Sequence, residues 1–161
     1  MLAVDGVAEA ADVAARIPPP ERLAAGPVVM AECFQAIPCD PCYHACPQKA
    51  FLPFEDLNSL PRVDYARCNG CGVCVTRCPG LALFIVDCSD PAGEALITLP
   101  YEFLPLPAAG ETVTGVDRAG QAVCAARVVK VVPGGPRSKT SLIRLAVPKD
   151  YAMTVRHWRR F

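Results

Sequence analysis

The hydrophobic residues of the chain fall in short runs, rich in valine, isoleucine and leucine, that are separated by turn residues. Runs of this kind, bounded by glycine, proline or aspartate, are typical of β-strands. Strands are predicted over residues 28–31, 61–64, 82–87, 95–101, 112–116, 122–132 and 141–147. The separators at residues 117–120 and 133–136 contain glycine and predict turns, so the last strands should form a small barrel or meander.

Helices are expected to be few and short. Helical turns are predicted in three places, residues 9–16, 43–51 and 75–81. Residues 150–160 place Tyr151, Val155 and Trp158 on one stripe at helical spacing. This pattern predicts a C-terminal helix whose apolar stripe packs onto its own domain.

Eight of the ten cysteines form two regularly spaced runs. The second run is a complete C-x2-C-x2-C-x3-C-P string, Cys68-Asn-Gly-Cys71-Gly-Val-Cys74-Val-Thr-Arg-Cys78-Pro79. The first run is Cys33-x5-Cys39-x2-Cys42-x3-Cys46-Pro47. Thiolates at this spacing are typical ligands of [4Fe-4S] clusters, and the last cysteine of each string ligates the neighbouring cluster. The predicted ligands of one cluster are Cys33, Cys39, Cys42 and Cys78, and those of the other are Cys68, Cys71, Cys74 and Cys46.

The last three cysteines of the first run, with their proline, recur 32 residues later in the second run. Each half of this internal repeat reads as strand, cysteine loop, short helix and strand. Two such halves predict a ferredoxin-like two-cluster (βαβ)2 domain over residues 28–100. The predicted fold class is α+β, with a small all-β barrel-like segment and the C-terminal helix over residues 101–161. Prolines and Gly26 predict an irregular N-terminal arm over residues 1–27.

The first run departs from the pattern because Ala36 stands where the repeat would place its first ligand. Either the loop over residues 34–38 brings Cys33 to the fourth iron, or Cys33 is a buried strand-end thiol. In the second case the site would hold a [3Fe-4S] cluster or an iron with an exchangeable ligand. Structural zinc fits the second run poorly, because zinc sites use paired C-x2-C units in a tetrahedral array. His44 lies between two ligands and is expected to shield or tune the cluster rather than bind iron.

Cys88 and Cys124 lie outside both runs and are expected to be buried free thiols. Gly70 and Gly72 let the second run curl tightly, so that backbone N–H groups can point at cluster sulfur. No nucleotide fingerprint or nucleophile elbow accompanies the cysteines, so the chain is a poor candidate for a whole enzyme.

The formal net charge of 0 hides an asymmetry. Residues 127–161 hold nine Lys and Arg against one acidic residue, whereas residues 1–126 hold seven against 15. The basic tail is therefore either a solvated or internally packed face or a docking surface for an acidic partner. The first 15 positions are acidic, without the pattern of a signal peptide, and no apolar run reaches ~18 residues. We expect no membrane span and a cytoplasmic location, where cysteines bind metal rather than form disulfides.

Over about residues 28–88 the chain resembles the bacterial two-cluster ferredoxins. Three strings, ECFQAIPCDPC (32–42), PYEFLPLP (100–107) and VPKDYAM (147–153), resemble the ferredoxin-type subunits of multi-subunit flavin-dependent amino-acid or imino-acid dehydrogenases. Those complexes act on proline, hydroxyproline, opines or similar amines. The shifted first cysteine is usual in that family, so the resemblance supports Cys33 as a ligand.

The resemblance implies a non-catalytic iron–sulfur subunit of a hetero-oligomeric complex. Its two [4Fe-4S] clusters would accept electrons one at a time from a flavoprotein partner that oxidises an amino or imino acid. A free-standing ferredoxin serving several reductases is the first alternative, and it would need only residues 28–100. A regulatory or nucleic-acid-binding iron–sulfur protein is the second. Its barrel strands lack the interleaved aromatics that stack bases, and the acidic half would be repelled by phosphates, so no nucleic-acid partner is expected.

Overall fold

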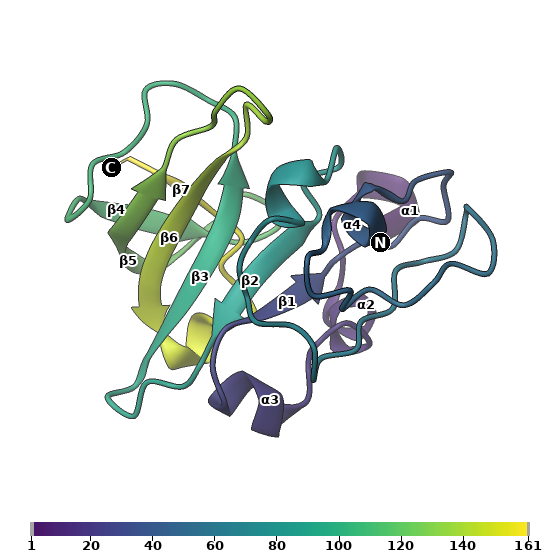
Figure 1. The fold of residues 1–161 in the computed structure, drawn as a ribbon. Helices are drawn as coiled ribbons and strands as arrows, with labels where there is room; N and C mark the ends of the chain where they lie inside the picture. Colours follow the sequence, from purple (N-terminus) through teal and green to yellow (C-terminus); the bar gives the residue numbers. More distant parts are fainter. Residues whose placement is uncertain (1, 161) are drawn as a thin grey trace.

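The chain folds around one curled antiparallel sheet, which Figure 1 shows from one side. A computed structural model describes residues 2–160. Within that range the strands are β1 (Val28–Ala31), β2 (Leu83–Asp87), β3 (Glu94–Tyr101), β4 (Thr112–Val116), β5 (Ala122–Val132), β6 (Ser141–Pro148) and β7 (His157–Arg159). Their order across the sheet is β1-β2-β3-β6-β5-β4-β7. The mixture of helix and sheet agrees with the predicted α+β class.

Most of the strand predictions are confirmed. The six strands from β1 to β6 match the predicted ranges to within about one residue at either end. The predicted strand over residues 61–64 is reduced to one bridge, in which Val63 pairs with Phe51. Side chains alternate in β3, where Ala95, Ile97 and Leu99 are fully buried in the main core and Thr98 lies on the opposite face.

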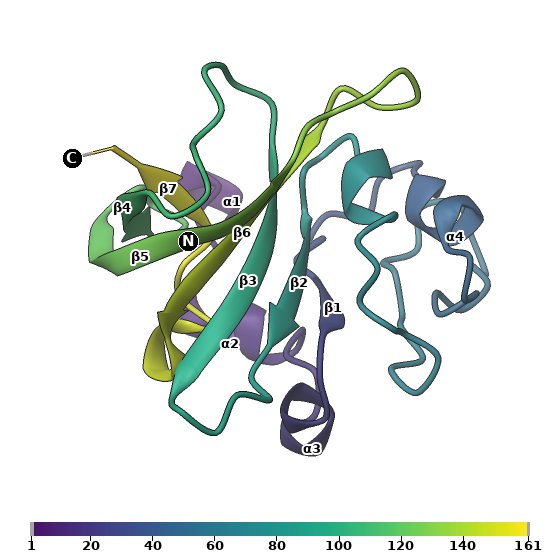
Figure 2. The ribbon, with the colours of Figure 1, turned by 60° about the vertical axis from the view of Figure 1, so that its left-hand side comes forward.

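Strands β1 and β2 are buried on both faces. Val28 and Met30 belong to the main core, whereas Val29 and Ala31 belong to a second core that includes several of the cysteines. The two strands therefore form a wall between these cores, and this explains why their sequences are apolar without alternation. Figure 2 shows the cysteine loops with α4 on one side of this wall and the strands β3 to β7 on the other.

The N-terminal segment is more regular than predicted. Residues 2–27 contain three short helices, α1 (Leu2–Asp5), α2 (Ala10–Ala14) and α3 (Pro20–Ala24). Pro20 occupies the first position of α3, where proline is favoured because its missing N–H would have no partner. Val13 and Leu23 are buried in the main core, so the segment packs on the sheet.

The helical elements of the cysteine loops are α4 (Pro41–Ala45) and the 3-10 helix η1 (Val75–Arg77). Both begin close to the predicted positions and end sooner. None of the helices within residues 2–160 has the length and apolar character needed to cross a bilayer.

The predicted C-terminal helix over residues 150–160 is wrong. The chain forms only the short 3-10 helix η2 (Lys149–Tyr151) and then strand β7, which pairs with β4. Trp158 lies opposite Gly115 in this pairing, and both Val155 and Trp158 are buried. Valine and tryptophan favour strands, and the open edge of β4 satisfied the backbone of the segment better than an isolated helix would.

The sheet is continuous across residue 100, where a domain boundary was predicted. All eight residues of β3 pair with β6, and both sides of the predicted boundary contribute to the main core. Strands β1 and β7 are the two edges of the sheet and are not paired with each other. The C-terminal strands therefore complete the core on which the cysteine loops rest.

Candidate metal centres

The two sets of four cysteines predicted from the sequence each line one cavity. The first cavity is lined by Cys33, Cys39, Cys42 and Cys78. The second cavity is lined by Cys46, Cys68, Cys71 and Cys74. Apolar side chains such as Leu83 and Phe51 complete the two walls. Each cavity thus combines the first three cysteines of one run with the last cysteine of the other run.

The internal repeat of the sequence is also a repeat of backbone conformation. Cys46 ends α4 with φ −74° and ψ 111°, and Cys78 ends η1 with φ −75° and ψ 112°. Three residues after each cysteine, Lys49 and Leu81 both adopt φ 51°, which is uncommon for residues other than glycine. The turn that follows each Cys-Pro pair is therefore the same in both halves.

Backbone N–H groups point at cysteine sulfur in three places. The donors are Val29 to Cys68 at 3.3 Å, Ala50 to Cys46 at 3.3 Å and Ala82 to Cys78 at 3.4 Å. Ala50 and Ala82 are equivalent in the repeat, because Ala50 follows Lys49 and Ala82 follows Leu81, the two residues with φ 51°. Hydrogen bonds of this kind stabilise negative charge on thiolate sulfur and tune a bound metal group.

The glycines of the second run are required by the local backbone. Gly70 has φ +67°, and a Cβ atom at this position would lie 2.5 Å from the Cβ atom of Pro27. Gly72 has φ +80°, and its Cβ would lie 3.1 Å from Leu142 of β6. At Gly70 the loop that carries Cys71 passes too close to Pro27 to accept a Cβ atom, and at Gly72 the positive φ itself favours glycine.

Arg22 of α3 holds the second run in place, although it was not among the residues predicted to contribute to the site. Its guanidinium donates to the carbonyl oxygens of Tyr65 (2.9 Å), Gly26 (3.0 Å), Pro27 (2.8 Å) and Cys68 (2.6 Å). The last of these residues is a predicted ligand. No local pattern indicates this role, because the contact joins residues 46 positions apart.

Burial controls the ionisation of the cysteine thiols. Burial, with a smaller effect from nearby thiols such as Cys78, raises the pKa of Cys42 to about 12. Burial likewise raises the pKa of Cys74 to about 12, together with smaller effects from thiols of its own set and from Cys42 of the other set. These thiols ionise near neutral pH only when a cation replaces their protons, so metal binding would release protons. The two sets are adjacent, because cysteines of both belong to or pack against the second core.

The arrangement around each cavity can accommodate a cluster. The four thiols of each set stand around a cavity that apolar side chains complete, where they could hold a group of several iron and sulfide atoms at its edges. A single zinc ion would instead need its sulfur ligands about 2.3 Å from one point.

The remaining candidates lie outside both cavities. The exposed imidazole of His44 contacts Asp40 at 3.1 Å, rather than a cysteine. Cys88 and Cys124 are half-buried free thiols and line neither cavity.

Comparison with known proteins supports metal binding in the second half of the repeat. Residues 61–84, which include all four cysteines of the second run, match the 4Fe-4S binding domain family. A stretch of 45 residues is 38% identical to the pyruvate synthase subunit PorD of Methanocaldococcus jannaschii, and it covers 28% of this chain. It spans 50% of the length of that relative. No solved structure matches the chain. The chain therefore carries a ferredoxin-type [4Fe-4S] segment. These findings support the prediction that it is an iron–sulfur protein that transfers electrons.

Proposed function

We propose that the chain is a two-cluster electron-transfer subunit of an oxidoreductase complex. The observation that carries this proposal is the pair of adjacent cavities, each lined by four cysteines. The proposed ligands are Cys33, Cys39, Cys42 and Cys78 for one [4Fe-4S] cluster, and Cys46, Cys68, Cys71 and Cys74 for the other. The cysteines of the first run lie outside the matched family segment, so the first cluster rests on the cavity and on the backbone repeat.

A [4Fe-4S] cluster, when bound, supplies a one-electron redox centre. The residues of this chain have three roles toward it. The thiolates hold it, the N–H groups of Val29, Ala50 and Ala82 stabilise charge on three of the sulfurs, and apolar side chains limit the access of water. No residue here is assigned a role in bond chemistry on a substrate, so the subunit is proposed to be non-catalytic.

The proposed electron donor is a flavoprotein subunit that oxidises an amino or imino acid. Its substrate would yield two electrons, and two adjacent clusters can take them one at a time. The support is the resemblance of three strings to such subunits, together with the relative that is itself named a subunit. One of these strings, residues 100–107, contains the most exposed large apolar side chains near the end of β3, Phe103 at 65% and Leu104 at 85% exposure. Apolar residues this exposed favour a protein contact.

The experiment is an anaerobic purification of the tagged protein from its native cells, with iron and sulfide counted and co-eluting chains identified. Co-elution of a flavoprotein that reduces a dye with an amino or imino acid supports the proposal. Elution of a brown protein alone would favour the alternative, a free-standing ferredoxin.

The contact surface is tested by Leu104→Ser, with Val132→Ser as the matched control, because Val132 is also exposed, at 42%, in β5. Co-elution should fall with the first variant and not with the second. Point changes are preferable to removal of residues 102–161, because the C-terminal strands are part of the main core.

A further inference from the structure

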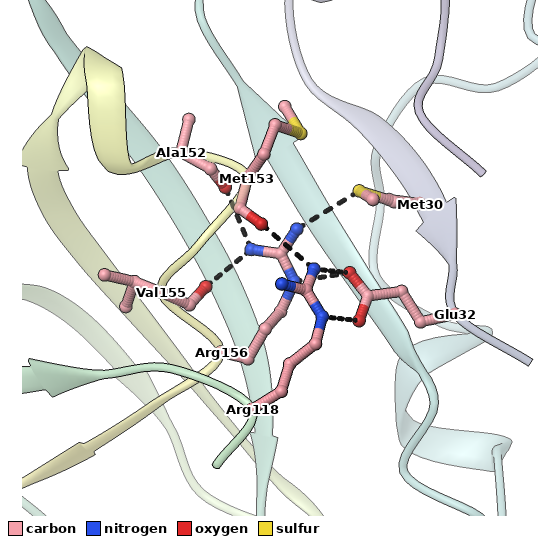
Figure 3. Close-up of polar contacts among 7 residues, drawn as sticks. All are labelled: Met30, Glu32, Arg118, Ala152, Met153, Val155 and Arg156. Atoms are coloured by element: carbon pink, nitrogen blue, oxygen red, sulfur yellow. Dashed lines mark hydrogen bonds and ion pairs between the residues drawn. The ribbon is translucent and has the colours of Figure 1, made fainter. Parts of the chain in front are cut away.

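A buried ion cluster joins the end of β1 to the C-terminal part of the chain (Figure 3). The carboxylate of Glu32 accepts hydrogen bonds from Arg118 Nε at 2.8 Å and Nη2 at 2.5 Å, and from Arg156 Nε at 2.6 Å. The side chains of Glu32 and Arg156 are 5% and 4% exposed, and that of Arg118 is 16% exposed. One carboxylate and two guanidinium groups therefore meet in the interior, between two edges of the sheet that share no backbone hydrogen bonds.

Both arginines make further hydrogen bonds to backbone carbonyl groups. Arg156 also donates to the carbonyl oxygens of Ala152 at 2.9 Å and Val155 at 2.5 Å, and Arg118 donates to that of Met153 at 3.0 Å. The two guanidinium groups donate to both oxygens of Glu32, so they hold the carboxylate as an anion in one position.

General stability does not explain such a cluster. Taking three charges out of water costs several kcal/mol per ion, and apolar side chains of similar volume often stabilise a fold equally well. A buried ion cluster is better suited to fix one particular arrangement of the chain, since removing one partner leaves an uncompensated charge.

Glu32 is the residue directly before Cys33, the predicted ligand whose spacing is irregular. Its backbone N–H continues the β1–β2 ladder by donating to Ala82 at 2.8 Å. Because side chains alternate along a strand, Glu32 points toward the main core while Cys33 lines the first cavity. Phe34, on the other side of Cys33, packs against the main core.

Cys33 is not among the three proposed ligands, Cys46, Cys68 and Cys78, whose sulfur accepts a backbone N–H at 3.3–3.4 Å. The contact of the Cys33 sulfur is a long one of 4.0 Å to the carbonyl oxygen of Gln35. Its position therefore depends on how firmly the end of β1 is held.

We propose that Glu32 is a positioning residue for the first cavity. Its ion cluster with Arg118 and Arg156 holds Cys33 where it can serve as the fourth ligand of a four-iron cluster, despite the shift of three residues from the repeat. The C-terminal part of the chain thereby becomes a condition for a complete first cluster. This inference rests on the proposed ligand set.

The test compares four variants of the full chain, purified without oxygen. Glu32→Gln removes the charge that both arginines share, and Arg118→Gln is milder because Arg156 still neutralises Glu32. Cys33→Ala is the reference for a lost ligand. Glu111→Gln is the matched control, since Glu111 also pairs with an arginine, Arg160, at 2.8 Å but at the surface.

Iron content and electron paramagnetic resonance of the oxidised protein are the readouts, with circular dichroism as a check of the fold. An oxidised three-iron cluster is paramagnetic, whereas an oxidised four-iron cluster of the ferredoxin type is silent. Cys33→Ala should lose about one iron per chain and show the three-iron signal. Glu32→Gln should show the same signal with the fold intact, Arg118→Gln a smaller one, and Glu111→Gln none.

Three results would overturn the inference or its basis, each in a distinguishable way. If Cys33→Ala keeps all its iron, the proposed ligand set fails. If Cys33→Ala loses iron but Glu32→Gln does not, only the positioning role fails. If Glu32→Gln does not fold, Arg118→Gln decides, and loss of both clusters together in that variant would mean that the ion cluster supports only the fold.

Discussion

Replacing Gly70 with alanine should disturb the second cavity through a single added methyl group. Gly70 lies between Cys68 and Cys71 and has φ +67°. Its Cβ would lie 2.5 Å from the Cβ atom and 2.8 Å from the carbonyl carbon and oxygen of Pro27. These atoms belong to a ring and to the backbone, so they cannot rotate away, and either the cysteine loop or the start of β1 must shift.

Two costs add up in the expected loss of stability of Gly70→Ala, one from the backbone conformation and one from the close contact. A left-handed backbone costs a residue with a Cβ roughly 1–2 kcal/mol. Forcing one more carbon into a packed site typically costs about 1–3 kcal/mol in addition. Gly120, in the turn between β4 and β5, has φ +76° with no atom within 4 Å of its Cβ position. Gly120→Ala therefore carries the first cost alone and serves as the control.

The assay is thermal unfolding of both loaded variants beside the wild type, together with the rate at which a chelator removes iron. For a chain of this length 1 kcal/mol lowers the melting temperature by about 2–4 °C, so Gly70→Ala should melt roughly 2–12 °C below Gly120→Ala. Iron should leave Gly70→Ala faster and leave Gly120→Ala at the wild-type rate. Equal melting temperatures and equal iron release would refute the argument that the loop is held against Pro27.

Three further predictions concern the rest of the molecule. Arg22→Gln removes charged donors from four carbonyl groups and should speed iron release from the second cavity. Arg62→Gln is the control and should leave iron release unchanged, because it breaks an exposed ion pair worth at most about 1 kcal/mol. Leu145→Ala, at a fully buried position of β6, should cost about 2–5 kcal/mol, measured as a lower melting temperature with unchanged spectra of the purified protein. Alkylation of the loaded protein, read by mass spectrometry, should label Cys88 and Cys124 alone. Burial raises the pKa of both thiols, so the midpoint of the labelling rate should lie at a higher pH than for a free cysteine. Labelling of all ten cysteines in the folded, loaded protein would contradict the proposed ligand sets.

Short-range patterns accounted for a large part of the fold. The strands from β1 to β6 follow from apolar runs and turn residues, because the alternation of side chains and the preference of glycine for turns are local properties. The grouping of seven cysteines followed from spacing, the resemblance added Cys33, and the structure places each set of four around one cavity. Spacing is informative here because a cluster demands ligands at short, regular intervals along the chain.

Local patterns failed where the partner of a segment decided its conformation. The stripe of Tyr151, Val155 and Trp158 fits a helix, but the open edge of β4 was available and the segment became β7. Of the short helices in residues 2–27, α2 lies within the predicted helical turn of residues 9–16, whereas α1 and α3 were not predicted. Prolines suggested an irregular chain around α3, although Pro20 begins that helix.

By itself, the sequence determined which residues could bind metal, how they divide into two sets and where most strands begin and end. Only the tertiary structure decided what holds those residues in place. Arg22 reaches Cys68 over 46 positions, and Arg156 reaches Glu32 over 124. Contacts at such separations depend on how the sheet curls and brings its two edges together. That curl is a property of the packed core as a whole, so the periodicity of one segment does not predict it.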